Sequence, residues 1–594
     1  MLKKTEKRKP KHAVRSLIMI RCYCFLTLLL FCASLACRHV PKPDLIVHHG
    51  KLVTVDSNFG IAEAMAIAGD RILATGSNDQ ILDLAGLQTR QIDLRGKTVL
   101  PGLMDSHLHA VTSAMFEFDH PVPDMETLSD VLEYIEARAK ALPKGAWVVV
   151  SQVFVTRLRD QRYPTRQELD KVAPNNPVLF RTGPDAVLNS LALKLDGIDK
   201  NYVVPAGVPC RIERNPRTAE PTGILRNCEI KYKSSEKQPT RDDYLRRMRM
   251  LLADYNSVGI TSISDGDTSD EEVEIFRQLK ESGQLTCRTF MVLHVEANDP
   301  FDKIEARIHQ AARSPLHQPN DLLWLRGIKS YLDGGMLTGS AYMLQPWGVS
   351  KVYSITDPAY RGMRYIEPER LYQLARLALE NGFQFTVHAV GDGAVQAIVE
   401  AYERVNRDFP VHDLRPSITH ANFMTADIIH KMKELGVVAN LQPDWLYLDG
   451  ATLRRQFGDA RLEYFQPYKT LFEEGVMVGG GSDHMQKIGS LRSINQYNPF
   501  LGMWITLTRQ PRWTDQPLHP EQRITREQAI RLYTINNAYL TFEENQKGSL
   551  EKGKLADFIM LDRDILTCPL DEVKDIKVDA TYLGGKLIYT KPGL

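Results

Sequence analysis

The sequence predicts an α/β protein in which repeated βα units build a parallel sheet between two β-rich ends. From about Pro101 to Leu540, short apolar strands alternate with amphipathic helices, a pattern typical of a parallel sheet buried on both faces. On either side, residues 45–74 and 557–589 form short β-rich runs. Neither end has enough strands for a stable core, so we expect one small sheet domain assembled from both termini. Periodicity alone permits a (β/α)8 barrel or an open doubly wound sheet.

Capping signals mark several of the predicted helices. Thr240-x-x-Asp243 and Thr525-x-x-Gln528 are capping-box patterns, and Thr425 precedes a helix that ends before Gly436. A further helix is expected over 367–381, with apolar side chains on one face and a glycine after its end. Short apolar strands at 437–441 and 476–479 separate these helices, which extends the βα alternation along the chain.

Composition excludes some classes of function. The chain has 594 residues, 43% of them hydrophobic and 25% charged, with a formal net charge of +1. This charge balance argues against a nucleic-acid-binding protein, and we expect no nucleic-acid partner.

The first 37 residues predict a signal peptide. A basic segment from Met1 to Arg15 precedes an apolar run from Cys22 to Ala36, which is shorter than the ~20 residues of a membrane-spanning helix. The ending Leu35-Ala36-Cys37 resembles a bacterial lipoprotein signal, in which Cys37 would be lipidated. We expect an exported bacterial protein, periplasmic or anchored to the membrane as a lipoprotein; an uncleaved N-terminal anchor is the alternative.

The cysteines do not form a metal-binding or disulfide-rich pattern. Four lie in the predicted leader, and the remaining four are scattered without a CxxC pair: Cys210, Cys228, Cys287 and Cys568. A thiolate metal site and a disulfide scaffold are therefore not expected, while one disulfide in an oxidising compartment stays open.

The strongest chemical signal is the run from Thr98 to His109, in which an apolar strand leads into His107-Leu108-His109. Side chains at positions i and i+2 of a strand point the same way, so both imidazoles can reach one metal ion. Neutral imidazole is a common ligand of zinc and related metals. The pair therefore predicts a metal site.

Three more ligand-type residues follow predicted strands: His388, His420 and Asp483. Taken singly, each histidine could be a hydrogen-bonded structural residue and the aspartate a helix N-cap. Together with the His-x-His pair, however, they place five ligand-type residues at the carboxyl ends of four strands. Those ends meet at one rim of a (β/α)8 barrel, which favours the barrel and a metal centre at its mouth.

The chain resembles the amidohydrolase superfamily, and more narrowly amidohydrolase family 3, the branch containing N-substituted formamide deformylases. The resemblance covers about residues 44–589 and includes the runs 100–109, 387–392, 481–483 and 548–557. It implies a TIM-type (β/α)8 metallo-barrel at 101–540 and a small β-sandwich from both ends, residues 38–100 and 541–594.

The resemblance also implies roles for residues outside the five ligands. In members with two metals, a carboxylated strand-end lysine bridges the ions, and Lys329 occupies that place; a rim lysine or a substrate contact is the alternative. Family members often carry a histidine where this chain has Pro184-Asp185. We expect Asp185 and Asn189, from the same segment, to contact the substrate.

These observations predict a metal-dependent hydrolase of carbon–nitrogen bonds in a small, non-peptide amide. One or two divalent ions, with zinc expected, would lower the pKa of a bound water toward ~7. Asp483 would accept the proton from the attacking hydroxide and pass it to the leaving nitrogen. A deaminase or lactonase using the same site, and a surface binding protein without catalysis, are the alternatives. The sequence is compatible with a homodimer.

Overall fold

The computed structural model describes residue 1 and residues 42–234, 236–490 and 492–593. The predicted signal peptide and the predicted lipidation of Cys37 fall outside these ranges. Among the residues described, we find no helix that combines the length and the apolar character needed to cross a membrane.

The centre of the molecule is a (β/α)8 barrel of parallel strands, as the sequence predicts. Its strands neighbour one another in chain order: β8 (Leu103–Leu108), β14 (Ile260–Thr268), β15 (Arg288–His294), β16 (Leu323–Tyr331), β17 (Gln384–Ala389), β18 (Ser417–His420), β19 (Val438–Leu441) and β20 (Val478–Gly480). A parallel bridge between Leu108 and His484 joins the first strand to the segment after the last. The ring therefore closes at its carboxyl end.

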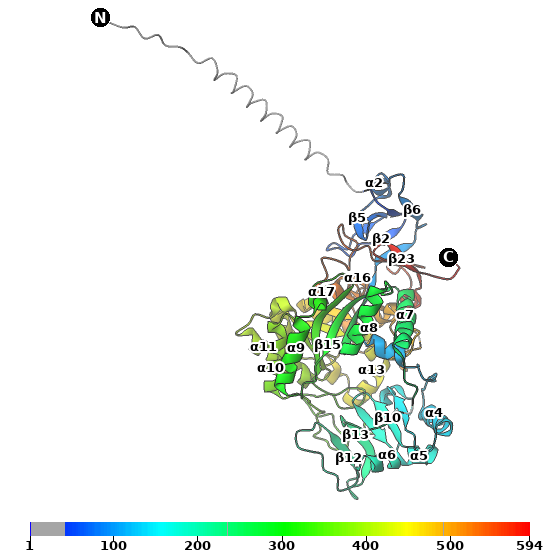
Figure 1. The fold of residues 1–594 in the computed structure, drawn as a ribbon, viewed down its shortest axis with the longest axis vertical. Helices are drawn as coiled ribbons and strands as arrows, with labels where there is room; N and C mark the ends of the chain where they lie inside the picture. The colour runs from blue at the N-terminus through cyan, green and yellow to red at the C-terminus, as the bar shows by residue number, and fades with distance from the viewer. Residues whose placement is uncertain (2–41, 235, 491, 594) are drawn as a thin grey trace.

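Helices, most of them amphipathic, surround the barrel (Figure 1). They include α7 (Arg241–Ser257), α8 (Asp270–Glu281), α9 (Phe301–Ala312), α10 (Pro368–Glu380), α11 (Asp392–Asn406), α12 (Ala426–Leu435), α13 (Pro443–Phe457), α14 (Tyr468–Glu474), α15 (Pro499–Thr508), α16 (Arg526–Leu532) and α17 (Ile535–Leu540). The capping boxes at Thr240 and Thr525 are present, and Gly436 ends α12 in the left-handed conformation. The predicted boundaries of these helices agree with the structure to within one or two residues.

Both chain ends meet in two small sheets at the amino end of the barrel. One sheet has the order β5-β4-β1-β6 and the other β23-β22-β21-β7-β2-β3. The strands are β1 (Leu45–His48), β2 (Lys51–Val53), β3 (Ile61–Ala62), β4 (Ala64–Ala68), β5 (Arg71–Gly76), β6 (Arg90–Asp93), β7 (Thr98–Pro101), β21 (Phe558–Leu561), β22 (Val578–Leu583) and β23 (Lys586–Thr590), with α2 (Asn78–Leu82) beside them. Because β21 pairs with β7, the six-stranded sheet takes strands from both termini, whereas the four-stranded sheet consists of N-terminal strands alone.

A single glycine connects the terminal sheets to the barrel. Gly102 lies between β7 and β8, and its backbone N–H donates to the carbonyl of Asp557 at 2.9 Å. A Cβ at this position would lie 2.2 Å from the hydroxyl oxygen of Thr261, so no larger residue fits. This tight passage fixes the position of β8, the strand that carries His107.

Between β8 and β14 the chain forms a separate five-stranded sheet that the sequence analysis did not distinguish from the barrel. Its order is β12-β13-β11-β10-β9, with β9 (Val148–Ser151), β10 (Val178–Thr182), β11 (Asp185–Leu188), β12 (Arg211–Arg214) and β13 (Pro221–Arg226), preceded or accompanied by α3 (Ala110–Met115), α4 (Leu128–Ala141), α5 (Arg166–Val172) and α6 (Ser190–Leu195). β9 and β10 are parallel with a helix between them, so locally they look like one more barrel unit.

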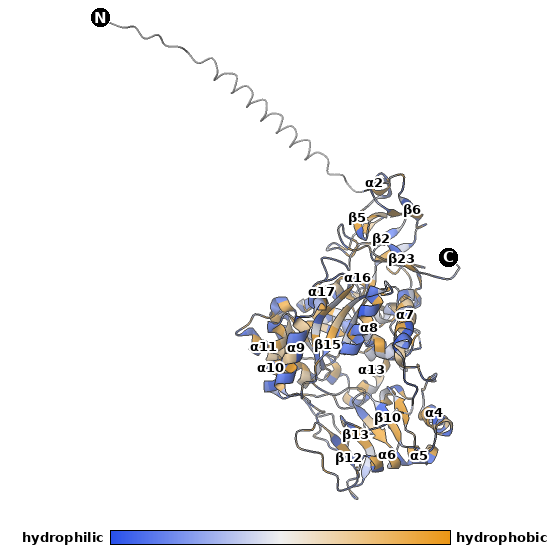
Figure 2. Ribbon diagram, viewed as in Figure 1, coloured by the Kyte–Doolittle hydropathy of each residue, from blue (hydrophilic) through white to orange (hydrophobic). Residues whose placement is uncertain are grey.

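The three parts stack along the long axis of the molecule. In Figure 1 the terminal sheets lie at the top, the barrel in the middle and the inserted sheet at the bottom. Apolar residues concentrate on strands such as β15 and β10, shown orange in Figure 2, whereas the outer helices carry hydrophilic blue faces. One buried cluster joins Leu293 of the barrel to Phe180 of the insert, and the terminal sheets have a separate core.

A disulfide joins Cys210 and Cys228 in the insert, while Cys287 and Cys568 are free. Cys210 and Cys228 are 18 residues apart, and the bond between them closes the loop that carries β12 and β13. The sequence left one disulfide open, and the structure identifies its partners.

A buried ion pair ties the terminal sheets to the barrel, and its loss should destabilise the protein. Arg288 at the start of β15 donates to both carboxylate oxygens of Asp557, at 2.6 and 2.8 Å. Arg288→Met would leave the carboxylate buried without its partner and should lower the free energy of unfolding by about 3 kcal/mol. Urea unfolding followed by circular dichroism measures this. Arg277→Met, which removes exposed ion pairs on α8, serves as the control; equal midpoints for the two variants would contradict the prediction.

Candidate metal centre and active site

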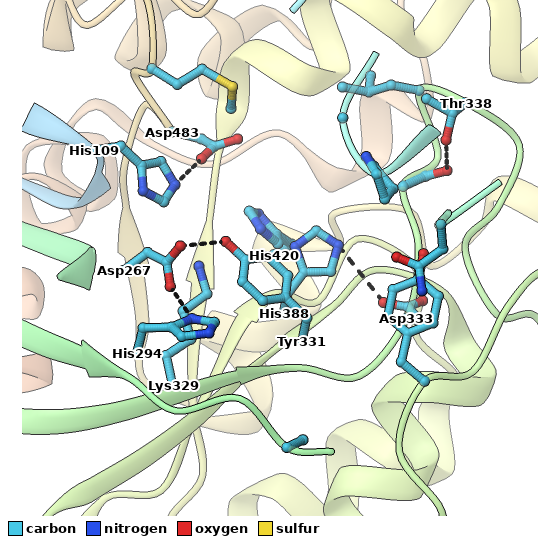
Figure 3. A pocket seen from close by; sticks show the side chains of 18 of the residues that line it. His109, Asp267, His294, Lys329, Tyr331, Asp333, Thr338, His388, His420 and Asp483 are labelled. Carbon is cyan, nitrogen blue, oxygen red and sulfur yellow. Dashed lines mark hydrogen bonds and ion pairs between the residues drawn. The ribbon is translucent and has the colours of Figure 1, made fainter. Parts of the chain in front are cut away.

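The six residues predicted as metal ligands converge at the carboxyl end of the barrel, and Figure 3 labels all of them except His107. They are His107 on β8, His109 just after it, Lys329 on β16, His388 on β17, His420 at the end of β18 and Asp483 after β20. Strand ends thus supply every one of them, as expected for a barrel site.

Asp483 lies between the two histidines of the first strand. Its Oδ1 atom is 3.2 Å from Nε2 of His109 and 3.5 Å from Nε2 of His107. Nζ of Lys329 lies 3.5 Å from the same nitrogen of His107. The imidazole of His107 therefore lies between the carboxylate of Asp483 and the amine of Lys329, which are far apart in the sequence.

The other two histidines complete the cluster. The ring centroids of His388 and His420 are 4.5 Å apart, and those of His107 and His420 are 5.3 Å apart. Ligand atoms of His107, His420 and Asp483 all lie within 4.8 Å of one another. This spacing suits donors around one cation.

Burial keeps most of these imidazoles neutral. It lowers the pKa of His107 well below the usual value, and the nearby Lys329 lowers it further. Burial, assisted by His388, has the same effect on the pKa of His420, and it lowers the pKa of His388 to about 3. Neutral imidazole is the form that binds metal, so these three rings are ready to act as ligands at neutral pH.

His109 behaves differently because of Asp483. Burial is the largest influence and lowers its pKa, but the hydrogen bond to Asp483 and the negative charges of Asp483 and Asp267 together outweigh it, so the net shift is upward. A cation between the two groups would take the place of that proton, so the pair is compatible with metal binding.

The backbone is strained where two of the ligands are presented. His420 and Asp483 have φ of 79° and 53°, and Ala421, which follows His420, has φ of 40°. Non-glycine residues in this region cost of order 1–3 kcal/mol each and concentrate at functional sites. The strain turns the two side chains out of the strand direction, and no sequence pattern signalled it.

His420 is held in place by residues of the following strand and helix, β19 and α13. Its Nδ1 atom is 2.7 Å from Oε1 of Gln442, whose amide nitrogen donates to the carbonyl of Asn440. The ring of Trp445 stacks on the imidazole, with centroids 4.6 Å apart and an interplanar angle of 15°. These contacts leave Nε2 of His420 as the nitrogen available for a ligand bond.

Lys329 is buried beside a group of residues that the sequence analysis missed. Burial lowers the pKa of its amine, although Asp267, Asp483 and Asp265 oppose the shift. Asp267 accepts a hydrogen bond from the Tyr331 hydroxyl at 2.8 Å and lies 2.7 Å from Nδ1 of His294. Asp267, His294 and Tyr331 end strands β14, β15 and β16, so the strand-end rule that found His388 and His420 also applies to them.

A cavity of about 550 Å³ opens above the cluster, a size typical of small-molecule sites. The barrel contributes ligand residues and neighbours to its wall, and the insert contributes a second wall. The lining includes His109, Asp267, His294, Lys329, Asp333, His388, His420, Trp445 and Asp483 on the barrel side.

The two residues expected to contact substrate do not line this cavity. Asp185 is fully buried and pairs with Arg226 at 3.1 Å. Asn189 caps α6, and its side-chain oxygen accepts from the backbone N–H groups of Val178 and Ala192. The structure therefore gives both side chains structural contacts. Pro184, next to Asp185, reaches the cavity in its place.

The donor set fits a divalent metal ion. Four imidazoles and a carboxylate provide nitrogen and oxygen donors of the kind that zinc prefers, they are almost fully enclosed, and three of the imidazoles are neutral. Fold and site together define a metal-dependent hydrolase built on a (β/α)8 barrel.

The chain belongs to the amidohydrolase family, whose model matches residues 90–589. It is 28% identical to the N-substituted formamide deformylase of Arthrobacter pascens over 563 residues, covering 93% of this chain and 99% of that protein. The putative amidohydrolase YtcJ of Bacillus subtilis is 24% identical over 562 residues, covering 92% and 99%.

Solved structures share the fold. An uncharacterised metal-dependent hydrolase from Pyrococcus horikoshii superposes with a TM-score of 0.63 at 21% identity, covering 89% of this chain and 99% of that one. A similar protein from Pyrococcus furiosus gives 0.61 at 22%, covering 88% and 100%. The family match extends from the terminal sheets through the whole barrel, and the protein is a hydrolase.

Removing the support of His420 should weaken metal binding. Gln442→Leu deletes the acceptor that orients the ring and should lower metal affinity by about 10- to 100-fold. Competition with a chelator, followed by metal analysis, measures the change. Gln384→Leu is a matched control, because Gln384 is also buried but bonds to carbonyls at the amino end of β17. Equal affinities in both variants would show that Gln442 does not support the metal site.

Proposed function

We propose that the protein hydrolyses a carbon–nitrogen bond of a non-peptide amide in a small molecule. The observation that carries this proposal is the convergence of four histidines, a lysine and an aspartate at one cavity, which all of them except the buried His107 line. The similarity to a protein named N-substituted formamide deformylase supports an amide as the substrate.

We propose that His107, His109, Lys329, His388, His420 and Asp483 hold one or two divalent metal ions, with zinc as the expected metal. When bound, such an ion supplies Lewis-acid polarisation of the substrate carbonyl and activation of water at neutral pH. The enclosure of the site supports this role, since electrostatic interactions are stronger where water is excluded.

Carboxylation of Lys329 would complete a site for two ions. Its amine is 1% exposed, and a buried ammonium is costly. Burial favours the neutral amine, the form that reacts with carbon dioxide to give a carbamate. An anionic oxygen ligand would then stand where an unmodified lysine would repel a cation.

Asp483 is the residue best placed to move a proton. Its Oδ1 atom faces the two histidines of β8, while Oδ2 is 3.4 Å from Nδ2 of Asn495. A carboxylate at the cavity floor can accept a proton from the attacking water and return it to the leaving nitrogen. Asp483 has left-handed backbone geometry, and its carboxylate contacts both histidines.

We also propose that residues 1–37 direct export, with Cys37 as the site of lipidation. The disulfide between Cys210 and Cys228 supports an oxidising compartment, because disulfides persist outside the reducing cytosol.

Asp483→Asn tests the proposed proton transfer. The amide keeps the shape of the carboxylate but cannot carry the proton, so kcat for amide hydrolysis should fall by about 10²-fold or more. The wild type is first assayed on formamides, other N-acyl amines and lactones, and metal content is measured for both proteins.

A matched control is Asp413→Asn, which alters an exposed carboxylate beside His412 and should leave the rate unchanged. If Asp483→Asn retains metal and hydrolyses the best substrate at the wild-type rate, Asp483 does not move the proton. If the metal-loaded wild type cleaves no amide in the panel, the proposed function itself is wrong.

A further inference from the structure

The wall of the cavity that faces the metal cluster comes from the inserted sheet. We call it the insert wall and define it by the residues that line the cavity from this part of the chain: Gln152, Phe154, Gly183, Pro184, Pro209 and Asn227. None of these residues carries a charge. The insert wall is thus chemically distinct from the barrel wall, where most of the charged side chains lie (Figure 3).

Two buried arginines of the insert, Arg226 and Arg157, are engaged elsewhere. Arg226 is fully buried and donates to Glu213, to Asp185 and to two backbone carbonyls of the loop after β16. Arg157 pairs with Asp449 at 3.0 Å. Neither guanidinium is available to neutralise a negative charge inside the cavity.

Away from the metal cluster, the rest of the described cavity lining offers no lysine or arginine side chain. Among the described residues that line it, Lys329 is the single lysine or arginine. The carboxylates of Asp267, Glu296, Asp333 and Asp483 line the same space. Lys329 is buried beside His107 and belongs to the metal cluster. A carboxylate on a substituent held at the insert wall, away from the metal cluster, would therefore be desolvated without a cationic partner, which costs free energy.

The insert wall has a fixed shape. The backbone N–H of Asn227 donates to the carbonyl of Pro184 at 3.1 Å, and its side-chain amide donates to the carbonyl of Pro209 at 2.8 Å. The disulfide links Cys210 and Cys228, the residues that follow Pro209 and Asn227. These contacts hold Pro184, Pro209 and Asn227 in fixed relative positions. The insert wall therefore cannot readily rearrange to accept a charged group.

We propose that the insert wall binds the substituent on the amide nitrogen and selects an uncharged, apolar substituent over one that carries a carboxylate. This inference rests on the proposed amide hydrolysis, since it assigns the part of the substrate that extends away from the metal cluster. Phe154, Pro184 and Pro209 provide the apolar contact surface. The buried ion pair of Arg226 with Asp185, two residues that lie behind this wall, holds it against the loop after β16.

A matched pair of substrates isolates the effect of charge. The metal-loaded, full-length enzyme is assayed for formate release from 6-formamidohexanoate and from its methyl ester, which differ in the charge at the far end of the substituent. We expect kcat/KM for the ester to exceed that for the acid by at least about tenfold, which corresponds to about 1.4 kcal/mol.

A positive charge placed on the insert wall should reduce the ratio of kcat/KM for the ester to that for the acid. Pro209 is half-buried at the wall, and Pro209→Arg should improve kcat/KM for the acid relative to the ester by roughly fivefold, by pairing with the carboxylate. Val203→Arg is the control, because Val203 is 82% exposed and belongs to the insert but not to the cavity lining; it should leave the ratio unchanged. If Pro209→Arg does not fold, as judged by thermal unfolding, Gln152→Arg places the same charge on the same wall.

The outcomes separate the inference from the proposed function. Equal kcat/KM for acid and ester in the wild type overturns the charge selection but leaves amide hydrolysis intact. A ratio that responds equally to the wall variant and to Val203→Arg overturns the insert wall as the binding surface. Hydrolysis of neither compound by an enzyme that cleaves other amides of the panel overturns this inference alone. If the metal-loaded enzyme cleaves no amide at all, the proposed function is wrong and this inference with it.

Discussion

The closure of the barrel between β8 and the segment after β20 is the contact on which the site depends. The backbone N–H of Asp483 donates to the carbonyl of His107, and that of His109 donates to the carbonyl of His484, both at 2.8 Å. These two bonds bring residues nearly 380 positions apart into register. Asp105 supports the closure, because one of its oxygens accepts the backbone N–H groups of both His107 and Ser482. Burial raises the pKa of Asp105 to about 7. A buried carboxyl group that loses a hydrogen-bond partner is costly. Loss of the contact of Asp105 with either His107 or Ser482 would therefore disturb both the barrel closure and the metal site.

The three parts of the chain have separate tasks around that closure. The terminal sheets fix the start of β8 through Gly102 and the ion pair of Arg288 with Asp557. The barrel gathers the ligand side chains at its carboxyl rim, where strained backbone at His420 and Asp483 directs them inward. The insert covers that rim with an uncharged wall. The barrel therefore carries the ligand residues, whereas the insert is placed to contact the part of a substrate that lies away from them. A site added to a common fold in this way can vary without a change of fold.

Local sequence signals predicted what is local in the structure. Capping residues such as Thr240 and Thr525 set helix starts, and the strand-end rule found five of the clustered side chains because parallel strands must end at one rim. The sixth, Lys329, was predicted from the family resemblance. The insert was missed because β9, α5 and β10 repeat the βα pattern, and only long-range pairing with β11 and β13 separates them from the barrel. Asp185 and Asn189 were expected to contact substrate, but polar residues near a cavity can equally serve the backbone, and their orientation depends on strand pairing that no pattern in that segment reveals.

We propose that the side chains of the candidate metal centre surround a metal ion. Anomalous scattering from crystals of the metal-loaded protein tests this most directly. We predict one or two peaks, within bonding distance of the imidazole nitrogens of His107, His109, His388 and His420 and of the Asp483 carboxylate, with metal analysis giving the matching stoichiometry. The same electron density would show whether Lys329 carries a carbamate. Metal-loaded crystals with no anomalous peak at the cavity floor, or with the ion bound elsewhere, would contradict the account.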